Sequence, residues 1–188
     1  MSLEHLDLSQ NRLGTPIASY YLASSTLLTS QLTYLSLADQ EETTEDWLYG
    51  LAITTSRWEK LAALNASYSA SISAGSMLGI CESMPRLKRL LVRNSYVTKD
   101  ALTLFGRSNL FTSIEEIDLS VSGRDGPCVS RGVEARRVED CFCARRAENL
   151  KVLKLRASAT RQSRKYDRKA LKALKSMHGE GVKYVIVD

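Results

Sequence analysis

Apolar residues recur along this chain in a short phrase. In residues 3–11, LEHLDLSQN, leucine holds the first, fourth and sixth places, and polar residues hold the others. Leu6 and Leu8 alternate with polar residues as in a half-buried strand, whereas Leu3 is spaced from Leu6 as on a helix face. One copy therefore does not distinguish the two structures. The phrase begins again in the same register at Leu32, Leu61, Leu87, Ile114 and Leu150, and in a shorter form at Val182.

The repetition of the phrase decides the fold class. Its seven copies contain 21 fixed places, of which 20 hold Leu, Ile or Val, with Ala66 as the exception. These three residue types make up 44 of the 188 residues, so chance would fill about five of the places. The copies start 29, 29, 26, 27, 36 and 32 residues apart. Self-similarity with a period of this size predicts a stacked-repeat solenoid.

The segments between the phrases predict helices. Residues 97–105 offer Thr98 as an N-cap, and residues 43–52 offer Thr44 in the same role. Residues 167–177 carry lysines on one helix face and apolar residues on the other. The side chains expected to face inward are Val97, Ala101, Leu102 and Phe105; Trp47, Leu48 and Leu51; and Ala170, Leu171, Leu174 and Met177. The order strand, turn, helix predicts an α/β fold with a parallel sheet.

The first phrase also resembles a known family. The segment LEHLDLSQNRL matches the leucine-rich repeat, L-x-x-L-x-L-x-x-N/C-x-L, at every fixed place, from Leu3 to Leu13. Spacings of 26 to 29 residues are similar to those of the longer, helix-containing repeats of the ribonuclease-inhibitor and F-box-associated types. The resemblance covers essentially the whole chain. It implies one domain over residues 1–188, a short horseshoe of about seven coils with the sheet on the concave face and helices on the convex face.

The ninth place of the phrase departs from the family pattern. There the family carries Asn or Cys, whose side chain bonds backbone of the neighbouring coil. A serine hydroxyl is shorter but can still donate and accept, so we expect the turn to be satisfied locally and the coils to be irregular. The residues at this place are Asn11, Gln40, Ser69, Ser95, Ser122 and Ser158.

Charged residues form stripes on the expected concave face. Lys88 and Arg89 begin the fourth strand, the acids of residues 115–118 follow on the fifth, and Lys151 and Lys154 on the sixth. Strand alternation places Glu116 and Asp118 on one face and Glu115 on the other, and favours an exposed acidic patch over an acid/base pair. Neighbouring strands lie about 4.8 Å apart. The stripes therefore form either cross-strand ion pairs of small energy or a docking surface for a protein. The candidate protein-binding residues are Lys88, Arg89, Arg93, Glu116, Asp118, Lys151, Lys154 and Arg156.

Charge is also unequal along the chain. Residues 1–123 hold 9 Lys and Arg against 13 Asp and Glu, whereas residues 124–188 hold 17 against 8. The basic half predicts an anionic neighbour, which could be nucleic acid, anionic lipid or an acidic protein face. Few aromatics accompany it, so contact with RNA would involve phosphates and not base stacking. The candidate anion-facing residues are Arg161, Arg164, Lys165, Arg168 and Lys169.

The histidines and cysteines of the sequence give little support for a catalytic, metal or cofactor site. The two histidines, His5 and His178, lie in the first and last repeats, where a shared site is not expected. The cysteines at 81, 128, 141 and 143 fit the ligand spacing of a structural zinc site poorly. Buried helix cysteines are the favoured interpretation, and a zinc site or a disulfide are the alternatives. We expect no enzyme activity, no metal and no cofactor.

Localisation and function follow from these expectations. No apolar run approaches the roughly 18 residues of a membrane span, and the start lacks the regions of a signal peptide, so we expect an intracellular protein, cytoplasmic or mitochondrial. Terminal coils of a solenoid are normally capped, and here neither is, so we expect either a fragment of a longer array or partners at one end or both, in addition to a partner on the concave face. The sequence predicts a non-catalytic scaffold or adaptor, a subunit of a larger assembly. The alternatives are a nucleoprotein component that contacts RNA backbone and a substrate-receptor fragment of a ubiquitin ligase.

Overall fold

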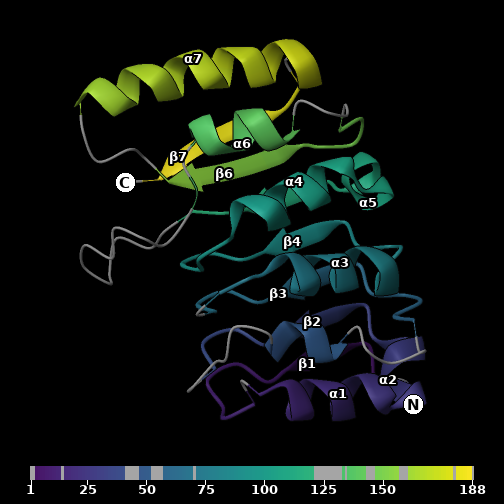
Figure 1. Cartoon of the computed structure of the whole chain (residues 1–188). Helices are drawn as coiled ribbons and strands as arrows, with labels where there is room; N and C mark the ends of the chain where they lie inside the picture. The colour runs from purple at the N-terminus through teal and green to yellow at the C-terminus, as the bar shows by residue number, and fades with distance from the viewer. Residues whose placement is uncertain are drawn as a thin grey trace.

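A computed structural model shows how the repeats stack (Figure 1). It describes residues 3–13, 15–40, 47–51, 57–69, 71–120, 133, 135–142, 147–156, 161–179 and 181–187, without the side chains of Arg136 and of residues 161–164. The strands are β1 His5–Asp7, β2 Tyr34–Ser36, β3 Ala63–Asn65, β4 Arg89–Leu91, β5 Glu116–Asp118, β6 Val152–Arg156 and β7 Lys183–Val187. The helices are α1 Pro16–Ser24, α2 Thr26–Gln31, α3 Ala74–Ser83, α4 Lys99–Arg107, α5 Asn109–Ser113, α6 Ala135–Phe142, α7 Arg161–His178 and the 3₁₀ helix η1 Trp47–Leu51.

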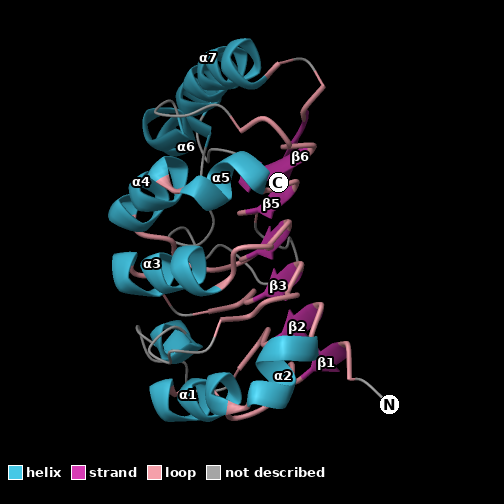
Figure 2. Ribbon diagram, turned by 90° about the vertical axis from the view of Figure 1, so that its right-hand side faces the viewer, coloured by secondary structure: helices cyan, strands magenta, loops and turns pink. Residues whose placement is uncertain are grey.

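The strands form one parallel sheet in the order of the sequence. Each strand pairs with the next, from β1 to β7, with no strand inserted between neighbours. The first six strands each begin at the third place of the apolar phrase, so the phrase sets the register of the sheet. The larger helices, among them α1, α3, α4, α6 and α7, line one side of this sheet (Figure 2). The predicted α/β fold with a parallel sheet is confirmed.

The fixed apolar places form the core between the sheet and the helices. The fourth-place residues lie opposite one another in register through the inner strands, and each is at most 1% exposed. Full burial of such a side chain contributes about 1.5–3 kcal/mol relative to exposure, so the rows stabilise the stack strongly. These fourth-place residues are Leu35, Leu64, Leu90, Ile117 and Leu153.

The helices bury the side chains that the sequence pattern assigned to them. Thr98 caps α4, because its Oγ1 accepts the N–H of Ala101 at 3.2 Å, and the apolar stripe of α4 is buried. Of the four residues predicted to face inward on α7, Ala170 and Leu174 are buried, whereas Leu171 and Met177 are only partly buried. The segment after β2 differs from its prediction: residues 47–51 form a 3₁₀ helix and not an α-helix, although its tryptophan and leucines are buried. The predicted cap Thr44 lies outside the described residues.

The turn after each of the first four strands adopts the same backbone conformation. The eighth place has a positive φ in all four, at Gln10, Asp39, Tyr68 and Asn94. Such a left-handed residue without glycine costs about 1–2 kcal/mol, so the surrounding contacts must hold it. Its recurrence at one place shows that the repeats share a turn as well as a strand.

The ninth-place side chains supply those contacts. Gln40 donates from Nε2 to the carbonyl of Leu8 in the preceding repeat at 2.7 Å. Ser69 donates to the carbonyl of Ala66 at 2.6 Å, and the Oγ of Ser95 accepts the N–H of Ser69 at 3.0 Å. The expectation that serine can satisfy this turn is confirmed at these two positions. Ser122 and Ser158 lie outside the described residues.

Candidate functional site

The side of the sheet away from the helices, called the open face below, displays two rows of residues. The first row holds the third-place residues His5, Tyr34, Ala63, Arg89, Glu116 and Val152, and the second holds the fifth-place residues Asp7, Ser36, Asn65, Leu91, Asp118 and Lys154. On β7 the pairing is shifted by one place of the phrase, so Lys183 and Val185, its second and fourth places, continue the two rows. Because side chains alternate across a strand, both rows point away from the buried leucines. From β4 to β6 these rows are rich in charge, which makes this part of the open face the candidate site.

At the start of these strands, one acid lies between two lysines. The Oε1 of Glu115 is 2.9 Å from the Nζ of Lys88, and its Oε2 is 2.6 Å from the Nζ of Lys151. The hydrogen bond from Lys151, and next the one from Lys88, lower the pKa of Glu115 to about 2. The carboxylate therefore stays ionised and crosslinks three neighbouring strands.

The position of Glu115 corrects the expectation from strand alternation. It does not lie on the core side, because its carboxylate reaches lysines that are exposed to solvent. The reason is the start of the strand, where the N–H groups of Glu115 and Glu116 both bond the carbonyl of Lys88, at 2.7 and 2.9 Å. Two successive donors on one acceptor break the simple alternation, and Lys88 and Lys151 begin their strands in the same way. The sequence placed Glu115 in the acidic stripe but not among the candidate binding residues.

Further along the strands, one lysine lies between two acids. The Nζ of Lys154 is 2.9 Å from Glu116 and 3.4 Å from Asp118. The hydrogen bond from Glu116 is the main cause that raises the pKa of Lys154. Asp118 also accepts from the N–H and the Oγ of Ser120, at 3.1 and 2.6 Å. Ser120, which the sequence did not single out, thus orients the acid that Lys154 binds.

The acids of the site are all engaged in these ion pairs. Three lysines balance three acids, so the charge of Arg89 and Arg93 is a surplus. Among the described residues, Arg89 and Arg93 form no ion pair. The Nε of Arg93 is buried and has no hydrogen-bond partner in the described part of the chain. The structure thus brings the predicted stripes together as cross-strand pairs, with a positive excess at Arg89 on β4 and at Arg93 just after it.

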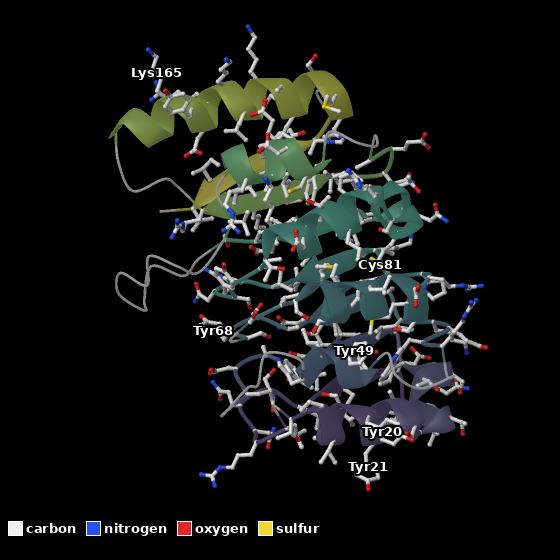
Figure 3. All side chains as sticks on the ribbon, viewed as in Figure 1. Tyr20, Tyr21, Tyr49, Tyr68, Cys81 and Lys165 are labelled. Carbon is white, nitrogen blue, oxygen red and sulfur yellow. The ribbon has the colours of Figure 1, made fainter. Side chains whose placement is uncertain are left out.

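The second predicted group lies elsewhere, on α7. Lys165, Arg168 and Lys169 are exposed along this helix, and Figure 3 shows Lys165 pointing away from the sheet. The side chains of Arg161 and Arg164 lie outside the described residues. The helix belongs to the layer opposite the open face. The structure therefore does not join the two basic groups into one site.

The histidines and cysteines are placed apart from the open-face charges. His5 lies on β1, while His178 ends α7, is buried, and accepts the N–H of Ala147 at its Nδ1 (3.1 Å). Cys81 on α3 is a half-buried free thiol whose pKa burial raises to about 11, and Cys141 on α6 is buried. Cys128 and Cys143 lie outside the described residues. Within the described ranges, no three histidine, cysteine or acidic side chains cluster as metal ligands would.

Comparisons with known proteins add one similarity. No model of a protein family matches the chain, and no curated protein matches it. Among solved structures, the chain is similar to the tropomodulin C-terminal domain of Caenorhabditis elegans, with 18% sequence identity and a TM-score of 0.41, over 93% of this chain and 85% of that one. A similarity at this level carries no inference about function. Among the described residues, no helix combines the length and apolar character that crossing a membrane requires.

Proposed function

We propose that this chain is a leucine-rich-repeat solenoid of about seven coils that acts as a non-catalytic scaffold, and that its open face binds an acidic segment of a protein partner. The repeat architecture is supported by the seven phrases, the shared left-handed turn and the hydrogen bonds of the ninth-place side chains. A row of parallel strands with alternating outward side chains is a surface that such scaffolds can vary without disturbing the core.

The two surplus arginines, Arg89 and Arg93, are the observation that carries the binding proposal. The guanidinium group donates in a fixed fork that matches a carboxylate, so an arginine without an acid is suited to a carboxylate of a partner. Arg89 is exposed and Arg93 is partly buried, so an acidic segment that lies on the open face can reach both side chains.

The ion pairs around the arginines support the same function. Glu115 and Lys154 each form two ion pairs with opposite charges on neighbouring strands. Their side chains are therefore not available to bind a partner. They keep the sheet surface rigid and screen the arginines from the acids of β5. A preorganised surface loses less entropy on binding than a flexible one. We propose that the chain is an adaptor subunit of a larger intracellular assembly.

The test uses the purified full chain and synthetic peptides. Labelled extended peptides with two glutamates four residues apart, which place both carboxylates on one side, are titrated and followed by fluorescence anisotropy, with a glutamine version as the neutral probe. Substituting Arg89 and Arg93 by Ala together is expected to weaken acidic-peptide binding at least about tenfold. The matched control, Lys183→Ala, removes an exposed lysine of β7 and is expected to leave binding within about twofold. Equal binding of the acidic and neutral peptides would overturn the proposal.

A second function is favoured by the exposed basic side chains of α7. Lys165, Arg168 and Lys169 could contact nucleic-acid backbone without base readout. The probe is a double-stranded RNA of mixed sequence, titrated at low and high salt. Reversing the charge of all three residues would abolish salt-dependent binding if this function holds, whereas the double arginine variant of β4 would bind the RNA normally. Loss of RNA binding in the Arg89 and Arg93 variant alone would show that the RNA contacts the open face and not α7.

A further inference from the structure

We propose that a second copy of this chain docks on the free edge of β1, so that the sheet continues through both copies across a two-fold axis. The inference concerns a different surface from the proposed binding site, because β1 lies three strands away from β4. Three features support it: the outward-facing backbone of β1, the exposed apolar side chains beside it, and a register that places His5 opposite Asp7.

The outer side of β1 presents unpaired backbone. Among the described strands, β1 pairs with β2 alone. The carbonyl of Glu4 accepts from Tyr34 at 3.1 Å, and the N–H of Leu8 donates to Ser36 at 2.9 Å, so the even-numbered residues use their backbone toward β2. In a parallel pair the alternate residues direct their N–H and carbonyl groups to the other side. His5 and Asp7 therefore offer donors and acceptors to a further strand, as a free edge does.

Apolar side chains surround this edge. Leu3 is 45% exposed, although the residues at the same place in the next two repeats, Leu32 and Leu61, are 0% exposed. On α1, Ile17 and Tyr21 are 69% and 70% exposed. They are four residues apart and share a helix face, and Figure 3 shows Tyr21 pointing off the end of the stack, away from the other repeats. The β1 end of the described structure therefore exposes apolar side chains of both the strand and the helix.

The charges of β1 select a second copy in one arrangement. An antiparallel pairing of β1 with its own copy, centred on Leu6, places His5 opposite Asp7 of the second copy, and Asp7 opposite His5. Both lie on the outward-facing backbone positions, so each pair exchanges backbone hydrogen bonds as well. A pairing centred on Asp7 would instead oppose two like charges, which destabilises an antiparallel pair. The edge is therefore self-complementary, as a two-fold interface requires.

The two side chains are already held on the open face. The His5 ring stacks on Tyr34 of β2, with centroids 5.7 Å apart. Asp7 accepts the N–H and the Oγ of Ser9, and these bonds lower its pKa, so the carboxylate stays charged. A carboxylate has lone pairs for further donors, so it can accept from an imidazole as well. The two-fold axis perpendicular to the sheet also brings α1 of both copies to the same side, where Ile17 and Tyr21 meet their counterparts.

The experiment measures self-association of the purified full chain by sedimentation velocity over a concentration series. The expected result is a reversible monomer–dimer equilibrium. His5→Glu opposes two acids and Asp7→Lys opposes two basic groups, so each variant alone is expected to associate at least about tenfold more weakly. Mixing the two variants restores a one-to-one dimer, because Glu then meets Lys and the unchanged His5 meets the unchanged Asp7. Circular dichroism of each variant shows whether it is folded.

Two further variants test which end of the sheet forms the contact between the copies. Tyr21→Glu changes a side chain that is 70% exposed, so it leaves the fold intact and is expected to weaken the dimer. Lys183→Glu on β7 is expected to change nothing. If Lys183→Glu abolishes association, the copies join head to tail through β7 and the proposal is wrong. A wild-type chain that stays monomeric at every concentration, or variants that do not associate when mixed, would also overturn it.

Discussion

The first and the fourth repeats carry the same apolar phrase but differ in burial. In the fourth, Leu87, Leu90 and Val92 are at most 1% exposed. In the first, Leu3 is 45% exposed, and Leu6 and Leu8 are only partly buried. The first repeat is nevertheless the better match to the leucine-rich repeat pattern. The difference teaches that the phrase specifies a strand and a turn, whereas a neighbour on each side supplies the burial.

The largest expected effect is on the buried leucine row. Leu90→Ala is expected to lower the free energy of unfolding by about 2–5 kcal/mol, because it leaves a cavity between two packed repeats. Leu6→Ala removes a side chain that already contacts water, and we expect less than half that loss. Urea denaturation of both variants measures the difference. Equal losses would show that the first repeat is as well packed as the fourth. Because dimerisation would bury Leu6, its loss is expected to rise with protein concentration.

A smaller effect is expected where helices approach each other. A Cβ at Gly106 of α4 would overlap the carbonyl of Cys141, and one at Gly50 would overlap the carbonyl of Pro16. Gly106→Ala is expected to destabilise by about 1–3 kcal/mol, because α6 and α7 lie beyond it and cannot easily move. Gly50→Ala is expected to cost less, because α1 lies at the end of the stack and can shift outward. Thermal denaturation measures both, and a larger loss for Gly50→Ala would reverse the comparison.

The turn side chains provide a third comparison. Ser95→Ala leaves the buried N–H of Ser69 without its acceptor, and we expect a loss of about 1–3 kcal/mol. Asn11→Ala removes two bonds of 2.9 Å to the carbonyls of Leu8 and Ser9, but water replaces them because this turn is exposed. Its expected loss is below about 1 kcal/mol. Chemical denaturation of the two variants tests this, and a greater loss for Asn11→Ala would contradict it.

The smallest expected effect concerns pH. The folded pKa of Glu115 is lowered from 4.5 to about 2, so its contribution is present above about pH 4.5 and is lost as the pH falls through about 2. Glu115→Gln is expected to remove this dependence in that window. Because the pairs are exposed, added salt should weaken the effect in the wild type. The pKa of Asp7 is lowered mainly by hydrogen bonds from Ser9. Its contribution to the pH dependence of stability, which Asp7→Asn removes, is therefore expected to be insensitive to salt. Acid titrations at two salt concentrations separate the two.

Much of the fold could be predicted because its causes are local. The apolar phrase located the sheet strands, and the helix N-cap at Thr98 and the buried stripe of α4 followed from the spacing of a few residues. The 3₁₀ helix at residues 47–51 could not be predicted, since a stripe of Trp and Leu is compatible with either helix type when neighbours fix its geometry.

The candidate site was predicted in part. The stripes of Lys88, Glu116 and Lys154 came from placing successive phrases side by side, and the sheet register places them as expected. Glu115 was placed in the acidic stripe but assigned to the wrong face, because the start of its strand depends on a carbonyl of another repeat. The distinction between paired lysines and surplus arginines also required the structure, since it depends on distances between side chains of three strands.

The sequence alone determined the repeat, the location of its strands and the inward-facing apolar places of the first six, because these follow from a period that recurs in every copy. Only the tertiary structure decided how strongly each copy is buried, which charges are paired and how the last strand is registered. Those properties belong to contacts between repeats, and a phrase such as LEHLDLSQN carries no information about whether another repeat lies beside it.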